Sequence, residues 1–243
     1  MNQEWINHID FILDNGELVN PRGMSTYEVI GMQFTCDMNQ PILSILERQV
    51  GYKHMAREAW WILSGDNSVE NMPAYKKYSD DGKRLFGAYG PKIIDQISYC
   101  ENTLKNDLFS RQAVLNIWRE NPRQSKDIPC TLSMQFLIRN QKLYCVVNMR
   151  SSDAWLGIPY DVFVFSMVSL TIAQALNVSL GKLCINIGSA HVYEQDANTY
   201  AAIPMFTEIN YSIDLKTKPI HWCYQLMRDN YGSLGSLFEA RYA

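Results

Sequence analysis

The chain has 243 residues and a net charge of −3 at pH 7, with 47% hydrophobic and 19% charged residues. This ordinary globular composition provides a sizeable core for one domain. The slightly acidic balance, without any run of Lys or Arg, argues against a protein that binds nucleic acid or a membrane surface.

No targeting segment or membrane span is predicted. Residues 1–5 lack a basic region followed by an apolar stretch, and the longest apolar run, 162–176, contains polar residues and is too short to cross a bilayer. The six cysteines show no C-x-x-C spacing and no zinc pattern with the four histidines. We therefore expect a cytoplasmic protein without a metal, whose thiols are reduced and mostly buried.

Apolar periodicity and breaker residues predict the elements of the first half. A helical face formed by Trp5, Ile9, Ile12 and Leu13 ends before Gly16. The elements expected next are a loop at 23–31 feeding a strand at 27–36, a helix at 43–64, a polar loop at 71–90, a helix at 93–108, a strand at 111–118 and a charged connection at 119–126.

The second half opens with a predicted hairpin. Residues 131–139 and 142–150 are rich in β-branched and aromatic residues and flank the two-residue turn Asn140-Gln141. Residues 162–176 are apolar almost all round, which is the pattern of a central buried helix. A strand at 183–187 and an irregular tail from Glu194, with an amphipathic segment near 222–227, complete a single α+β domain over residues 1–243.

The stretch 128–161 gathers reactive groups. The hairpin folds Cys130 back toward Arg150 and Ser151, and the carboxylates of Asp153 and Asp161 follow. A thiol, a fixed cation, hydroxyls and carboxylates in one compact unit suit a nucleophilic site for an anionic substrate.

Two residues outside this stretch have alternative interpretations. Glu58, beside Trp60 and Trp61, is either a surface residue at the helix edge or a desolvated acid with a raised pKa. The pattern alone favours the surface. Arg22, just before Gly23, fits an anion contact and a solvated surface position equally well.

Several motifs, taken together, resemble the thymidylate synthase family. They are Cys130, Arg150-Ser151-Ser152-Asp153, Leu156-Gly157-Ile158-Pro159-Tyr160 and His191-Val192-Tyr193, joined by Glu58 ahead of Gly65-Asp66, by Tyr89-Gly90 and by Ser110-Arg111. The resemblance covers residues 20–195 and is specific, because these separate motifs occur in order. Within the family, Asn148-Met149-Arg150-Ser151, Gly188-Ser189-Ala190-His191 and the ending Arg241-Tyr242-Ala243 look most like deoxycytidylate (dCMP) 5-hydroxymethylases.

The resemblance implies a mixed β-sheet packed by helices around a central buried helix, and a folate-dependent reaction. Cys130 would add to C6 of a pyrimidine, and C5 would take the one-carbon unit of 5,10-methylenetetrahydrofolate. Glu58 would organise the attacking water or manage proton transfer. Because a free thiol has a pKa of about 8.5, we expect the Arg150 cation to help ionise Cys130.

The resemblance also implies two sets of binding residues. For the nucleotide they are Arg22, Tyr89, Arg111, Gln135, Arg150, Ser151, Ser152, Asp161, His191 and Tyr193. For the folate they are Asp153, Tyr75, Tyr78, Leu156 and Gly157. In a homodimer, Arg111 of one subunit would reach the phosphate bound by its partner, although Gln112 replaces the family's second arginine.

Position 161 decides the predicted base. Thymidylate synthases carry Asn there, whose amide complements the N3–H donor and O4 acceptor of uracil, whereas this chain has Asp161. A carboxyl group can accept from the amino group of cytosine and share a proton with N3. Asp161, and Thr131 in place of the family's histidine, therefore favour a cytidylate. The resemblance to dCMP 5-hydroxymethylases implies 5-hydroxymethylation as the leading reaction.

Alternatives remain open at this point. The nearest is a dCMP C5-methyltransferase that finishes by hydride transfer and releases dihydrofolate. Thymidylate synthase itself is disfavoured by Asp161. A hydrolase built on Cys130 and His191 lacks a recognisable oxyanion site, and the intact Cys130 and Glu58 argue against a non-catalytic nucleotide- or RNA-binding protein. The sequence does not choose between ribose and deoxyribose, or between water and hydride.

Overall fold

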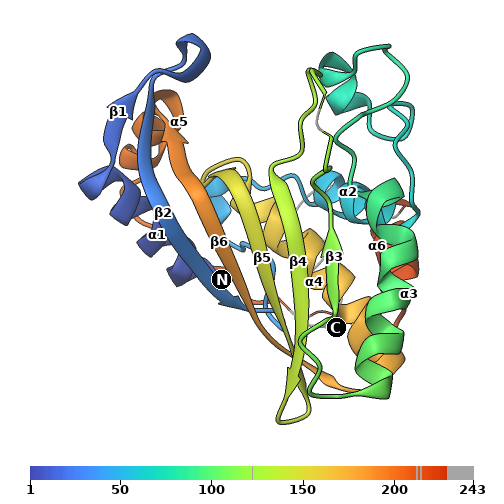
Figure 1. The fold of residues 1–243 in the computed structure, drawn as a ribbon. Helices are drawn as coiled ribbons and strands as arrows, with labels where there is room; N and C mark the ends of the chain where they lie inside the picture. Colours follow the sequence, from blue (N-terminus) through green and yellow to red (C-terminus); the bar gives the residue numbers. More distant parts are fainter. Residues whose placement is uncertain (122, 212, 214, 229–243) are drawn as a thin grey trace.

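The computed structural model in Figure 1 describes residues 1–121, 123–211, 213 and 215–228. Its sheet has six strands in the order β1-β2-β6-β5-β4-β3. The strands are β1 (Glu17–Val19), β2 (Thr26–Asp37), β3 (Val114–Asn116), β4 (Thr131–Arg139), β5 (Lys142–Asp153) and β6 (Ser179–Tyr193). Only β5 and β6 pair in parallel, so the sheet is mixed, as expected. The ending Arg241-Tyr242-Ala243 lies outside the described residues.

Helices cover one face of the sheet. They are α1 (Asn2–Asn15), α2 (Tyr52–Leu63), α3 (Gly90–Asn106), α4 (Ile158–Leu176), α5 (Glu194–Ala201) and α6 (Pro219–Arg228), with short 3-10 turns at Pro21–Gly23, Leu46–Arg48 and Pro73–Tyr78. By length and composition α4 is apolar enough to cross a membrane, but 72% of its apolar window is buried inside the protein. It packs against β5 and β6 behind the sheet, as Figure 1 shows, and is the predicted central buried helix.

The other face of the sheet carries a row of polar side chains. The Gln33 amide donates to Asn186 (2.9 Å), the Asn186 amide to Asn148 (3.1 Å), and the Asn148 amide to the Ser133 hydroxyl (3.2 Å). This row crosses β2, β6, β5 and β4. On the opposite face of β4, Met134, Phe136 and Ile138 are buried, so the period-two pattern separates a core face from a polar face.

Several element boundaries differ from the prediction. The helix expected at 43–64 begins only at Tyr52, because the backbone before it bonds elsewhere: Leu46 donates to Thr207, and Ile209 donates to Ser44. The strand expected at 111–118 is reduced to β3. In contrast, β6 extends the strand expected at 183–187 in both directions, and the tail begins with the regular helix α5.

The parallel pair positions the chemistry. Strand β5 leads into α4, and α4 leads back to β6, so the carboxyl ends of both strands and the amino end of α4 meet at one edge of the sheet. Crevices at the carboxyl ends of parallel strands are common ligand sites. Arg150, Asp153, Asp161, His191 and Tyr193 all come from this edge.

Candidate active site

A cavity of about 210 Å³ opens beside Cys130. Several elements contribute to it: α2, the Pro73–Tyr78 turn, the residue before α3, and the loop that enters β4. Among the lining residues are Glu58, Trp61, Tyr75, Tyr78, Tyr89, Asp127 and Cys130. The cavity therefore brings together five of the predicted site residues, from segments far apart in the sequence.

The Cys130 thiol sits next to a cation. Arg150 Nη2 lies 3.5 Å and Ser151 Oγ 3.9 Å from its sulfur. Burial nevertheless raises the pKa of Cys130; Arg150 lowers it, while the charge of Asp161 adds to the rise. The expected help from Arg150 is present, but burial outweighs it. The free protein therefore holds Cys130 as a thiol at neutral pH.

Arg150 also fixes the loop in front of the nucleophile. Its Nε donates to the carbonyl of Pro129 and its Nη2 to that of Ile128, both at 3.0 Å. The backbone N–H of Arg150 donates to the Cys130 carbonyl at 2.8 Å. A planar guanidinium can hold several acceptors in fixed directions, so Arg150 links β5 to the Cys130 loop while its side chain remains exposed.

Glu58 is the desolvated acid of the two alternatives, not a surface carboxylate. It is half-buried in α2 and faces the cavity, where the Tyr75 hydroxyl donates to it at 2.5 Å. Burial raises the pKa of Glu58 to about 7, although the bond from Tyr75 opposes the rise. A carboxyl group with a pKa near neutrality can both donate and accept a proton under physiological conditions.

Asp161 lies in the first turn of α4 and is half-buried. Burial raises its pKa well above the usual range, and the charges of Glu58 and Asp153 raise it further. Among the described residues, no side chain or backbone group donates a hydrogen bond to the Asp161 carboxyl. A protonated carboxyl without an internal partner can offer one donor and one acceptor to a ligand.

Asp153 and His191 are register partners across β5 and β6. Asp153 Oδ1 accepts the backbone N–H groups of Trp155 (2.8 Å) and Leu156 (3.1 Å), so this carboxylate caps the loop that begins α4. A Cβ at Gly157 would lie 2.8 Å from the Asp153 carbonyl, which explains why glycine stands there. Burial raises the pKa of Asp153, while His191 and Arg48 counteract the rise.

A second cavity, of about 740 Å³, adjoins the first. Tyr78 lines both, and Arg22, Leu156 and Tyr193 line the second. The ring of His191 meets that of Tyr193 edge-on, with 5.5 Å between the ring centroids. The two cavities thus share Tyr78, and the second is lined by residues predicted for the phosphate, the sugar and the folate.

Nine predicted residues are not among those that line the two cavities: Arg111, Gln135, Arg150, Ser151, Ser152, Asp153, Gly157, Asp161 and His191. Arg111 is exposed close to β3, and its carbonyl accepts from the Gln135 amide at 2.9 Å on the polar side of the sheet. Ser152 is only 3% exposed, and its hydroxyl has no partner among the described residues. Its side chain is therefore buried in the core.

Two residues of the site were not anticipated. Asp127 lines the Cys130 cavity and accepts the Gly87 N–H at 2.6 Å, and burial raises its pKa. Its position three residues before Cys130 was the available signal. Arg48 is buried, and its guanidinium carbon lies 4.7 Å from the centroid of the Trp155 ring. It also donates to the Trp155 carbonyl, which supports the 153–157 loop. Arg48 was not identified because it falls within the helix expected at 43–64. Among the described residues, no group of three His, Cys, Asp or Glu side chains is arranged to hold a metal.

Comparison with known proteins agrees with this geometry. The family model described as thymidylate synthase matches residues 3–204. The thymidylate synthase of Francisella tularensis subsp. holarctica (strain FTNF002-00 / FTA) is 26% identical over 218 residues, covering 79% of this chain and 80% of the relative. That of Coxiella burnetii (strain Dugway 5J108-111) is 24% identical over 208 residues, with 79% of each chain covered. The chain belongs to the thymidylate synthase family.

Proposed function

We propose that this family member is a cytidylate 5-hydroxymethyltransferase. It would convert dCMP or CMP, 5,10-methylenetetrahydrofolate and water into the 5-hydroxymethyl nucleotide and tetrahydrofolate. The observation that carries the proposal is Asp161, a half-buried carboxyl with a raised pKa and no hydrogen-bond donor among the described residues. Family membership supports the folate-dependent one-carbon transfer.

Asp161 suits the Watson–Crick edge of cytosine. In its protonated form the carboxyl would donate to N3 and accept from the exocyclic amino group, which satisfies both of its oxygens. Uracil presents a donor at N3 and an acceptor at O4, so the ionised carboxylate, which has only acceptors, would lose the pairing to O4, whereas with cytosine it accepts from the amino group and can share a proton with N3. Since an unpaired polar group in a closed site is costly, the carboxyl group discriminates between the two bases.

Cys130 and Glu58 would divide the covalent chemistry. The Cys130 thiolate forms a bond to C6 of the base, and the pyrimidine C5 then attacks the one-carbon unit. Because burial raises the pKa of Cys130, its proton must move to another group when the substrate is bound. Glu58, with a pKa of about 7, is the acceptor in the same cavity that can take a proton at neutral pH.

The choice of water over hydride draws support from the pair of Glu58 and Tyr75. Their hydroxyl–carboxyl hydrogen bond of 2.5 Å places two polar groups at the cavity wall, where a water molecule would be oriented toward the exocyclic methylene. Loss of the C5 proton and of tetrahydrofolate leaves that methylene, and addition of water to it, with release of the Cys130 thiolate from C6, gives the hydroxymethyl product. The runner-up is hydride transfer, which gives a methyl product and dihydrofolate.

The nucleotide phosphate would lie near Arg150, Ser151 and Arg22, with Arg111 of a partner subunit completing the clamp. Arg111 is exposed and lies outside the linings of both cavities of its own chain. A homodimer in which this arginine crosses to the other site is consistent with that position, and the His191–Tyr193 pair would hold the sugar 3′-hydroxyl.

A mass spectrum of the product tests the reaction. We expect incubation with dCMP and 5,10-methylenetetrahydrofolate to give a hydroxymethyl nucleotide, with CMP and dUMP run in parallel. Cys130→Ser is the control, since an alcohol is a far weaker nucleophile, and it should bind dCMP without turnover. A methyl product with dihydrofolate would move the protein to the runner-up, and conversion of dUMP alone would contradict the assigned base.

A further inference from the structure

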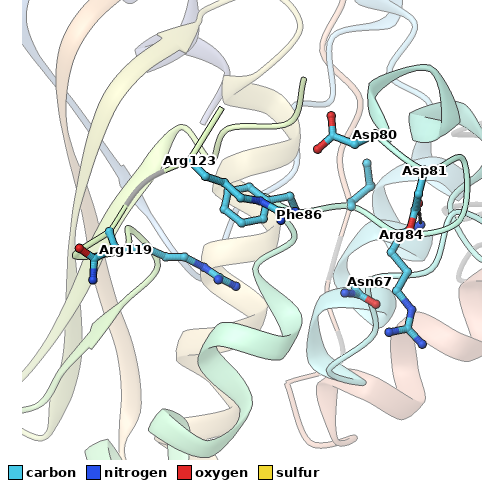
Figure 2. A pocket seen from close by; sticks show the side chains of 9 residues that line it. Asn67, Asp80, Asp81, Arg84, Phe86, Arg119 and Arg123 are labelled. Atoms are coloured by element: carbon cyan, nitrogen blue, oxygen red, sulfur yellow. Dashed lines mark hydrogen bonds between the residues drawn. The ribbon is translucent and has the colours of Figure 1, made fainter. Parts of the chain in front are cut away.

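A cleft of about 400 Å³ lies beside the candidate active site and is lined by different side chains. It opens between the 79–86 loop and the segment around 119–123, as Figure 2 shows. Leu85 borders both this cleft and the Cys130 cavity. The side chains on which the argument rests are Asn67, Asp80, Arg84, Phe86, Arg119 and Arg123.

Three positively charged side chains lie close to the ring of Phe86. The guanidinium carbon of Arg123 lies 4.2 Å and that of Arg119 4.7 Å from the centroid of its ring. In Figure 2 both arginines extend from one wall of the cleft toward Phe86. The Lys92 ammonium lies 5.7 Å from the same ring; burial, reinforced by the Arg119 charge, lowers its pKa to about 8. The cations are close enough to disfavour one another, so an anion between them would be attracted.

The nearby carboxylates already accept hydrogen bonds from groups in the loops. Asp81 accepts the backbone N–H groups of Lys83 (2.7 Å) and Arg84 (2.9 Å). Asp80 accepts from the Ser125 hydroxyl at 2.7 Å and the Lys126 N–H at 3.0 Å. These two acids shape the walls of the cleft. The bond from the Lys126 N–H and, to a smaller extent, the charge of Arg123 lower the pKa of Asp80, but neither acid forms an ion pair with an arginine of the cleft.

The arginines of the cleft have no counter-ion within the described residues. In the part of the chain that the structure describes, the ion pair found is between the amino group of Met1 and Glu4, at the N-terminus. Arg84, Arg119 and Arg123 form none. All three side chains are exposed. Guanidinium groups held in place by an aromatic ring lose little freedom on binding and match the geometry of phosphate oxygens.

We propose that this cleft is a second binding site, for a phosphate-bearing small molecule of nucleotide size. Arg119 and Arg123 would bind the phosphate oxygens. The Asn67 amide would donate to or accept from the rest of the ligand, and the free lone pairs of Asp80 would accept from it. The proposal does not depend on the reaction assigned above, since it rests on the cleft alone.

Binding of inorganic pyrophosphate to the full chain, measured by calorimetry at physiological salt, tests this site. The double variant Arg119→Gln/Arg123→Gln should weaken one binding event at least about ten-fold. Arg139→Gln is the matched control, because Arg139 also stacks on a phenylalanine, Phe109, with its guanidinium carbon 5.6 Å from the ring centroid. It should bind as the unmodified chain does. Arg150→Gln should retain the event that the double variant loses.

ATP extends the test to a nucleotide that lacks a cytosine base. It should compete with pyrophosphate on the unmodified chain and bind the double variant at least about ten-fold more weakly. Equal binding of pyrophosphate by the double variant and the unmodified chain would overturn the site, as would ATP binding that survives the double substitution. Neither outcome bears on the product mass spectrum, so the failure of one proposal is separable from that of the other.

Discussion

The functional group at position 161 is the main basis for the proposed preference between cytosine and uracil. A carboxyl and an amide have nearly the same shape there, and they differ in which protons they can hold. The Asp161 carboxyl combines burial with two neighbouring acids, Glu58 and Asp153, which together favour its protonated form. The protein has thus placed a carboxyl whose protonated form is favoured at the start of its central helix, where an amide would present a fixed pattern of donor and acceptor.

Asp161→Asn should reverse the preference between bases. We expect the ratio of kcat/KM for dCMP over dUMP to fall by about 100-fold or more, because the amide restores complementarity to uracil and leaves a cytosine pairing unmet. Steady-state kinetics with both nucleotides measure this ratio. An unchanged ratio would mean that other residues read the base.

Tyr75→Phe should displace the pH profile of the reaction. The Tyr75 hydroxyl donates to Glu58 and thereby holds its pKa down against burial, so removing the hydroxyl raises that pKa above the present value of about 7. If Glu58 acts as a base, the acidic limb of kcat moves to higher pH and activity at pH 7 falls roughly ten-fold. Tyr78→Phe is the control for the limb position, since Tyr78 donates no hydrogen bond to Glu58. A limb that stays in place in Tyr75→Phe contradicts the coupling.

At the scale of single elements, α1 carries a titratable group in the core. His8 is 3% exposed, its Nε2 has no partner among the described residues, and its ring meets Phe34 edge-on. Burial lowers the pKa of His8 from 6.5 to about 4. The native state therefore keeps the ring neutral over a range in which the unfolded chain takes up a proton.

His8 should make the protein less stable in mild acid. Below pH 6.5 the unfolded state binds a proton that the native state does not, so the free energy of unfolding falls as pH drops toward 4. We expect a loss of about 2 kcal/mol between pH 7 and pH 5 from this group. Urea unfolding at both values measures it. His8→Leu should reduce the loss, whereas His221→Leu, at an exposed position in α6, should leave it. An equal loss in His8→Leu would assign the effect to other groups.

Periodicity predicted most elements but failed where tertiary bonds override it. The segment 43–51 has apolar residues at helical spacing, yet its backbone pairs with 207–209, and Gln49 adopts a left-handed φ of 49° that ends the 3-10 turn. Local spacing contains no information about a partner about 160 residues away. By contrast, α4 was predictable because it is apolar on all sides, a pattern that holds whatever surrounds it.

For the whole molecule, Arg111 makes subunit complementation a test of assembly. Arg111→Gln and Cys130→Ser should each be inactive or nearly so when alone. If Arg111 serves the partner's site, mixed dimers contain one site with both residues intact, and an equal mixture recovers roughly a quarter of the original activity. Activity assays after co-refolding measure this recovery. A mixture that stays inactive, or a monomeric protein by sedimentation, would place Arg111 outside the site.

The motifs located the candidate site better than they described its electrostatics. Cys130, Glu58 and Tyr75 were predicted individually, and the structure puts them in one cavity. Arg150 lowers the pKa of Cys130, as expected, but burial outweighs it, and burial is a property of the folded assembly that the motif does not contain. The burial of Ser152, two residues after the exposed Arg150, likewise reflects a break in the alternation of β5, and its motif does not encode this.

The parallel pairing of β5 and β6 has a consequence for the order of folding. Asp153 and His191 become neighbours only after α4 has crossed behind the sheet and β6 has docked, because a parallel pair cannot close through a short turn. The β4–β5 hairpin can form early, but it supplies the nucleophile without the groups opposite it. Ligand binding should therefore slow hydrogen exchange most in β6, the strand that completes the pocket when it docks. With ligand bound, the amides of β6 should exchange through global rather than local unfolding.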